Sequence, residues 1–248
     1  MVHIDEKWFY MSDETQRFYL FSWEDDPYRA TQSKNFMEKV MVMVGIARPH
    51  ICNDGEIFWD GEIGVFSFTE QVAAKKNSKN RVAGTVKTKA LQSLTKFVIR
   101  SVLIDEMLPA IRLKWPLGAC KEIWIQQDNA RLHISPNDTN FLEAVTMDGF
   151  NIRLINQPAQ SPDLNILDLG FFRAVQSIQY KEFPRSLEEL LQAIENAYNT
   201  YDPKSLNFTW LHTQYCMLEI LKVNGGNGYK TLTMEREGFK EWDNCPFK

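Results

Sequence analysis

Residues 121–133 read Lys-Glu-Ile-Trp-Ile-Gln-Gln-Asp-Asn-Ala-Arg-Leu-His and join an apolar run to a carboxylate. The branched and aromatic side chains of residues 121–127 favour a β-strand. Asp128 then stands at the carboxyl end of that strand. A single Asp in this place is usually a turn former or a cap, so its chemistry depends on which partners the fold brings to it.

Two further acidic segments have a similar setting. Residues 3–9 (His-Ile-Asp-Glu-Lys-Trp-Phe) place Asp5 in a strand-like run, and residues 161–168 (Ser-Pro-Asp-Leu-Asn-Ile-Leu-Asp) place Asp168 near the start of a helix-like run. Carboxylates are hard oxygen ligands that suit Mg²⁺ or Mn²⁺, and two such ions can stabilise both oxygens of an in-line phosphoryl displacement. We therefore expect Asp5, Asp128 and Asp168 to share one phosphodiester-cutting centre with two ions.

The third acid requires a choice between Asp163 and Asp168. On a helix that begins near Leu164, Asp168 lies on one face with an apolar stripe that should pack on the sheet. Asp163 stands next to Pro162, where an Asp is favoured as a helix N-cap. We therefore predict Asp168 as the ligand and Asp163 as the cap.

The remaining pattern predicts an α/β domain with a mixed five-stranded central sheet flanked by helices. The expected strands cover 2–10, 16–23, 40–47, 121–127 and 150–156. The expected helices cover 88–114 (with a kink at Pro109), 138–147, 164–180, 186–198 and 208–222. The last two could form a helix-turn-helix, but the long break between them and the few basic residues of the second favour packing on the domain.

Composition limits the classes of function. The chain has 248 residues, 44% of them apolar, and a net charge of −4, so any contact with nucleic acid must come from a local patch. The four cysteines show no metal-ligand spacing, and no apolar run is long enough to span a membrane. We expect reduced thiols, no membrane association, no small-molecule cofactor, and a nuclear location (or a cytoplasmic one before import).

Residues 75–100 form that local patch. Between Gln71 and Ile104 the chain has no acid and eight basic residues. The predicted DNA contacts are Lys75, Lys76, Lys79, Arg81, Lys87 and Lys89. Lys and Arg supply much of nonspecific DNA affinity by neutralising phosphates. The alternative is an ordinary solvated charge run on a helix.

The three acidic motifs together resemble the catalytic domain of mariner-like transposases, in particular the branch common in plants. His-Ile-Asp-Glu-Lys-Trp-Phe (3–9), Gln-Gln-Asp-Asn-Ala-Arg-Leu-His (126–133) and residues 157–172 each match that family's pattern. The 39 residues between Asp128 and Asp168 also match the plant branch. The resemblance implies an RNase H-like fold over 1–223, with Asp5, Asp128 and Asp168 as the metal-binding triad.

The resemblance also implies a function, the catalytic core of a cut-and-paste DNA transposase, and leaves a homodimer open. Asn129 and Asn165 would brace the carboxylates by hydrogen bonds, or serve only as turn and cap residues. His133 would orient substrate or a metal-bound water, or be only a polar residue with satisfied hydrogen bonds near a helix start. Residues 50–88 would be an inserted hairpin and basic segment, and 224–248 a loosely held tail.

Family members also carry an N-terminal helix-turn-helix region, which we expect to be absent here because the first motif lies at residues 3–9. The alternative function is therefore a truncated or domesticated remnant that binds nucleic acid or a partner without catalysis.

Overall fold

A computed structural model describes residues 1–11, 21, 23, 24, 38–77, 82–226, 228 and 229. Its centre is a mixed five-stranded sheet in the order β5-β2-β1-β8-β9. These strands are β1 (Val2–Tyr10), β2 (Lys39–Ala47), β5 (Glu62–Ser67), β8 (Glu122–Gln127) and β9 (Asn151–Asn156). β1 is antiparallel to β2 and parallel to β8, so the sheet changes direction at its central strand.

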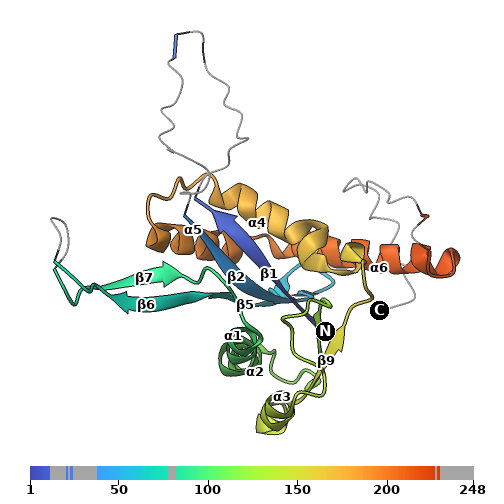
Figure 1. The fold of residues 1–248 in the computed structure, drawn as a ribbon. Coiled ribbons are helices and arrows are strands. Elements are labelled where there is room, and N and C mark those ends of the chain that lie inside the picture. The colour runs from blue at the N-terminus through green and yellow to red at the C-terminus, as the bar shows by residue number, and fades with distance from the viewer. Residues whose placement is uncertain (12–20, 22, 25–37, 78–81, 227, 230–248) are drawn as a thin grey trace.

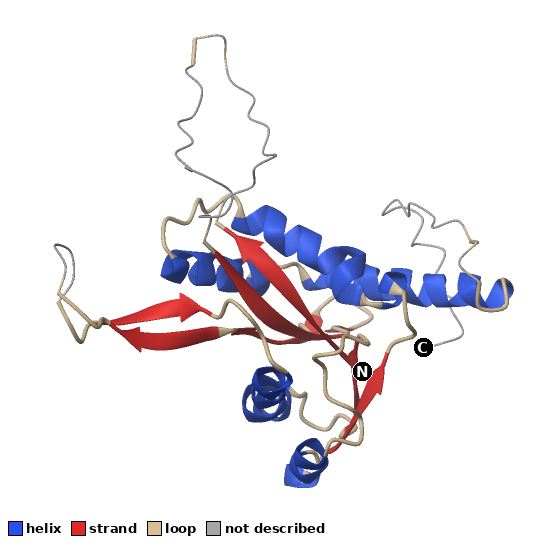
Figure 2. Ribbon diagram, in the orientation of Figure 1, coloured by secondary structure: helices blue, strands red, loops and turns tan. Residues whose placement is uncertain are grey.

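Helices cover both faces of this sheet (Figures 1 and 2). One layer contains α1 (Lys96–Ser101), η2 (Val102–Met107), α2 (Leu108–Lys114) and α3 (Thr139–Ala144). The other contains η5 (Leu167–Phe171), α4 (Phe172–Gln179), α5 (Leu187–Asn199) and α6 (Pro203–Lys222). Short 3₁₀ turns lie at Met147–Gly149 (η3) and Pro162–Leu164 (η4). The predicted α/β class and mixed five-stranded sheet are confirmed.

Alternation along the strands divides the interior into two cores, because successive side chains point to opposite faces of a sheet. Ile4 and Met43 belong to the core beneath α1, η2 and α2. Phe9 and Val44 belong to the core beneath α4 and α5. β2 is buried on both faces over Val42–Ala47, as expected of an interior strand.

The fifth strand differs from the prediction. Residues 16–20 and 22 of the expected strand 16–23 lie outside the described residues, and β5 takes the edge position next to β2. Residues 50–88 are therefore more than an insertion, since they supply β5 to the central sheet. They also form a small hairpin of β3 (His50–Ile51) and β4 (Ile57–Trp59), within the segment where a hairpin was expected.

The long helix also begins later than predicted. Residues 86–90 form β7, which pairs with β6 (Thr69–Ala73), and Thr95 accepts a hydrogen bond from Val98 N as the N-cap of α1. The apolar residues of β7 and those of the following helix are spaced so that together they resemble the stripe of one long helix. The helix passes through the π-helical turn η2 just before Pro109, whose missing N–H and ring disfavour regular α-helical bonding there.

The last helices pack on the domain. Leu187, Leu190 and Ile194 of α5 are buried in the second core, as is Leu206 of α6. Residues 230–248 of the expected tail lie outside the described residues. Among the described helices, none is both long and apolar enough to cross a membrane.

Candidate active site

The register of β1 and β8 brings the first two acids to one level. His3 is paired with Gln126 in this parallel ladder, and the same offset sets Asp5 beside Asp128. Asp128 follows the last residue of β8, so it leaves the sheet where Asp5 is still within β1. β1 and β8, the strands that bring the two acids to one level, are adjacent in the sheet.

Asn165 connects the first acid to the third. Its Nδ2 donates to Asp5 Oδ2 at 2.7 Å and to Asp168 Oδ2 at 3.2 Å. Its Oδ1 accepts from Leu167 N at 3.1 Å, which holds the amide nitrogen toward the two carboxylates. Asn165 is buried, Asp5 is buried and Asp168 lies at the exposed rim. Asn165 therefore braces two carboxylates, as one of its two sequence interpretations proposed.

The predicted helix cap at Asp163 is wrong. Asp163 lies within η4, whose N-cap residue is Ser161, and the helix that carries Asp168 begins at Leu167. The side chain of Asn165 instead accepts from the backbone N–H of Leu167 at the start of that helix. The apolar stripe was correctly placed, since Phe171, Phe172 and Val175 are all buried.

His133 connects the second acid to a residue that the motif analysis did not select. Its Nδ1 lies 2.8 Å from Asp128 Oδ1, and its Nε2 lies 2.8 Å from Glu6 Oε2. Nε2 is hydrogen-bonded to the Glu6 carboxylate, and Nδ1 is hydrogen-bonded to the main-chain carbonyl of Asp128 at 3.1 Å beside that carboxylate. Acceptors at both ring nitrogens favour the doubly protonated imidazolium. His133 thus offsets negative charge beside Asp128.

The electrostatics of the site follow from this crowding. Burial, together with the charges of Asp168 and Glu6, raises the pKa of Asp5 from its ordinary 3.8 to about 7. Burial also raises the pKa of Asp168, although the hydrogen bond from Asn165 opposes it. Burial would lower the pKa of His133, but the hydrogen bond and charge of Glu6 outweigh it and raise that pKa to about 9. Burial is thus the main reason that Asp5 and Asp168 resist ionisation, and the neighbouring carboxylates add to it at Asp5.

A pocket opens beside Asp128 and Asp168, lined also by residues 129–130 and 157–162. Asn129 lies at its edge, and its Nδ2 donates to the Gln157 carbonyl at 2.6 Å instead of to a carboxylate. Gln157 N in turn donates to Gln127 O at 2.8 Å. Asn129 therefore ties the loop of residues 157–162 to the end of β8 and shapes the pocket.

The three acids do not form a closed ligand set in this arrangement. Within the part of the chain that the structure describes, no group of three or more His, Cys, Asp or Glu side chains is arranged to hold a metal ion. The Asn165 amide joins Asp5 to Asp168, and His133 contacts Asp128. Without a cation between them the three carboxylates repel one another, which favours contacts of each with Asn165 or His133.

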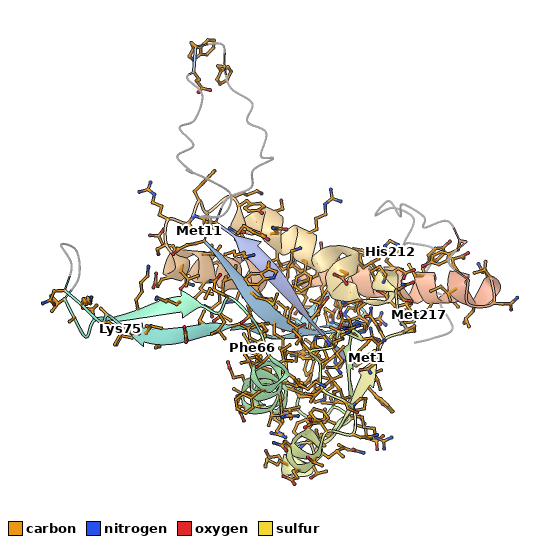
Figure 3. The ribbon with its side chains drawn as sticks, viewed as in Figure 1. Met1, Met11, Phe66, Lys75, His212 and Met217 are labelled. Atoms are coloured by element: carbon orange, nitrogen blue, oxygen red, sulfur yellow. The ribbon has the colours of Figure 1, made fainter. Side chains whose placement is uncertain are left out.

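The predicted DNA contacts lie away from this site. β6 and β7 form a two-stranded hairpin, Thr69–Ala90, that projects from the body, with Lys75 near its outer end (Figures 1 and 3). Lys75, Lys76 and Lys89 are exposed, and Lys87 is half-buried. Lys79 and Arg81 lie outside the described residues. Arg100, at the end of the basic run, is engaged by Asp138 at 2.5 Å.

The arrangement of strands and helices has counterparts among solved structures. No protein-family model and no curated protein matches the chain. A crystal structure of the catalytic domain of Mos1 mariner transposase matches with a TM-score of 0.51 and 12% identity, covering 92% of this chain and 83% of that one. The fold is RNase H-like, as in that catalytic domain. The prediction from the motifs is confirmed at this level.

Complexes of the longer Mos1 protein match as well. A pre-cleavage Mos1 transpososome gives a TM-score of 0.59 at 14% identity and a Mos1 paired-end complex with the left transposon end gives 0.56 at 16%. The matches cover 92% and 90% of this chain but only 56% and 55% of the Mos1 chains. The chain thus spans about half the length of those proteins. At such low sequence identity, the matches show a shared fold alone.

The raised pKa of Asp5 predicts a pH dependence of stability without metal. The unfolded chain loses this proton near pH 4 and the folded chain near pH 7, so the stabilisation is complete below about pH 4 and is lost as pH rises through about 7. Melting temperatures in EDTA should therefore fall across this window for the wild type. Asp5→Asn should remove much of that fall, and equal slopes for both proteins would contradict the assigned environment of Asp5.

Proposed function

We propose that this chain is the catalytic core of a cut-and-paste DNA transposase, which hydrolyses a phosphodiester and then joins the freed 3′-hydroxyl to target DNA. The observation that carries the proposal is that Asp5 and Asp128 stand at matching positions of two adjacent strands, while Asn165 links Asp5 to Asp168. The shared fold with Mos1 catalytic domain supports it, and the 39-residue spacing supports the plant-type branch.

The residues present fit a divalent cation by their chemistry. Three carboxylates supply hard oxygen donors, and burial raises the pKa values of Asp5 and Asp168, so a cation beside them would favour the ionised forms that bind it. Asp5 and Asp128 would hold one Mg²⁺ or Mn²⁺, and Asp168 would help hold a second. Such ions supply Lewis-acid activation of water and stabilise the charge that develops during in-line displacement. Solved Mos1 complexes with Mg and with Mn are consistent with this choice.

The chain's own residues prepare this chemistry. Asn165 fixes the orientation of Asp5 and Asp168 through a single amide. Asp128 uses Oδ1 for its contacts with Ala130 N and His133 Nδ1, and it lines the pocket, where no described residue hydrogen-bonds to its Oδ2. The pocket between the ends of β8 and β9 would admit the scissile phosphate beside Asp128 and Asp168.

The choice of the third acid gives a direct test of this proposal. In a nicking assay with Mn²⁺ and supercoiled plasmid, Asp168→Asn should lose activity by more than about 100-fold, because even residues that only support metal ligands cost 10- to 100-fold. Asp163→Asn is the matched control, five residues earlier in the 3₁₀ turn η4, and should retain activity. The opposite ranking would show that Asp163 is the third ligand.

If the wild-type protein is folded and binds DNA but does not nick it, the alternative of a DNA-binding protein without catalysis is favoured instead. DNA binding itself is part of the proposal. Its proposed surface is the β6–β7 hairpin, where positively charged side chains gather on an exposed projection.

The hairpin makes a separate prediction about DNA. Lys89 lies opposite Glu70 in the β6–β7 register, so its charge is partly offset, whereas Lys75 and Lys76 lie beyond that pair. The double variant Lys75→Ala/Lys76→Ala should weaken binding to random duplex DNA and reduce the slope of log K against log salt by about 1 to 2. Fluorescence anisotropy at several salt concentrations measures this. Lys222→Ala, whose charge is paired with Glu219, is the control, and an equal effect there would exclude the hairpin.

A further inference from the structure

Glu6 follows Asp5 directly but points to the other face of the sheet. In the β1–β2 register Asp5 is opposite Val44 and Glu6 is opposite Met43. Val44 lies in the core beneath α4 and α5, and Met43 lies in the core beneath α1 and α2. Glu6 therefore lies on the face covered by α1 and α2, which we call the rear face. Asp5 lies on the face covered by α4 and α5, which we call the front face.

The loop after Asp128 returns to that rear face. Ile134 is buried in the core beneath α1 and α2, and its carbonyl accepts from Gln127 Nε2 at 2.7 Å. This bond and the buried side chain fix the neighbouring His133, whose side chain is only 5% exposed. His133 thus reaches Glu6 with one ring nitrogen and Asp128 with the other.

The contacts of Glu6 are concentrated on this histidine. Its Oε2 lies 2.8 Å from His133 Nε2, and its side chain is 11% exposed. Its Oε1 is buried and has no hydrogen-bond partner among the described residues. A buried carboxylate with one charged hydrogen-bond partner is held in position by that partner. Glu6 and His133 therefore fix each other's side-chain orientation.

We propose that Glu6 is a positioning residue that acts through His133, holding the imidazole so that Nδ1 keeps the Asp128 carboxylate turned toward the site. The chain Glu6–His133–Asp128 clamps one metal-binding acid from the rear face, while Asn165 orders the other two from the front. The inference rests on the proposed function for its consequence, but the clamp itself is a property of the fold.

The first test measures the clamp without metal or DNA. In ¹⁵N-labelled protein in EDTA, the His133 ring N–H protons should resonate far downfield, because Nε2–H donates to the Glu6 carboxylate and Nδ1–H to the main-chain carbonyl of Asp128, with Asp128 Oδ1 2.8 Å away. Glu6→Ala should lose the Nε2–H signal and shift or broaden the Nδ1–H signal, while Glu122→Ala, an exposed carboxylate on β8, should change neither. An unchanged Nδ1–H signal in Glu6→Ala would overturn the proposal, whether or not the wild type binds metal.

The second test measures Mn²⁺ affinity by calorimetry. Glu6→Ala should weaken binding about 10- to 100-fold, as loss of a residue supporting a metal ligand does. Glu6→Gln retains an oxygen that can accept from Nε2–H, so it should lose much less. Equal losses in Gln and Ala would show that Glu6 acts only by its charge and would overturn positioning. Absence of Mn²⁺ binding in the wild type would overturn the proposed function and leave the clamp to the first test.

A double variant shows whether Glu6 acts through His133. His133→Ala should weaken Mn²⁺ binding at least as much as Glu6→Ala, and adding Glu6→Ala to His133→Ala should cause no further loss, since residues in one chain of contacts are not additive. Additive losses would mean that Glu6 acts independently and would overturn the proposal. Thermal melts of each variant in EDTA confirm that the compared proteins are folded.

Discussion

Asp128→Asn should reduce metal-dependent nicking of DNA by more than about 100-fold, with Mn²⁺ and with Mg²⁺. The Asn side chain retains one oxygen and the shape of the residue, but it loses the negative charge that a divalent cation requires. Gel separation of nicked and supercoiled plasmid measures the effect. Asp138→Asn, an acid in the next loop that is engaged by Arg100, is the control and should remain active.

The same variant should respond differently to metal in thermal melts. A ligand that binds only the folded protein stabilises it by about 2.7 kcal/mol at a hundredfold excess over Kd, so millimolar Mn²⁺ should raise the wild-type melting temperature. Asp128→Asn should show a much smaller rise. Without metal its melting temperature should change little, because it loses repulsion from Asp5 and attraction to His133 together. Equal metal-induced shifts in both proteins would remove Asp128 from the ligand set.

Phe171→Ala should destabilise the protein by about 3–5 kcal/mol, the usual cost of removing a large aromatic side chain from a core. Phe171 is 1% exposed and packs edge-on against Tyr198 at 5.8 Å and Tyr201 at 4.9 Å between ring centres. Urea denaturation followed by tryptophan fluorescence measures the free energy of unfolding. The loss is large because α4, α5 and the helix carrying Asp168 meet at this ring.

Phe97→Ala is the matched control, because Phe97 is 73% exposed in α1. It should change the free energy of unfolding by less than about 0.5 kcal/mol, as surface substitutions usually do. Similar losses in the two variants would show that Phe171 does not hold the core together. At temperatures where Phe171→Ala remains folded, its nicking activity should also fall. Phe171 is the last residue of η5, the helical turn that carries Asp168, and its buried ring anchors that turn in the core.

Much of the site could be predicted from the sequence because local patterns carry it. The apolar run before Asp128 and the stripe after Asp168 determine a strand and a helix by side-chain periodicity alone. The resemblance of the motifs then identified the three acids as one set and implied an RNase H-like fold. The observed fold agrees with that prediction. Their roles as metal ligands remain predictions.

The failures have local physical reasons. The helix expected over 88–114 begins at Lys96, because five residues of alternating strand, Val86–Ala90, precede it with a compatible apolar spacing. Asp163 looked like a cap next to Pro162, but a 3₁₀ turn occupies that position and Asn165 contacts Leu167 N instead. Competing short-range signals cannot be separated without tertiary contacts.

The sequence by itself determined the alternation of strands and helices, the positions of the three acids along the chain and the absence of acids from the basic run, since all of these are properties of neighbouring residues. Only the tertiary structure decided that β1 lies parallel to β8, which sets Asp5 beside Asp128. It also decided that Asn165 reaches two acids 160 and 3 residues away, and that Glu6 meets His133 behind the sheet. Such contacts depend on strand order and loop paths, which periodicity within one segment does not encode.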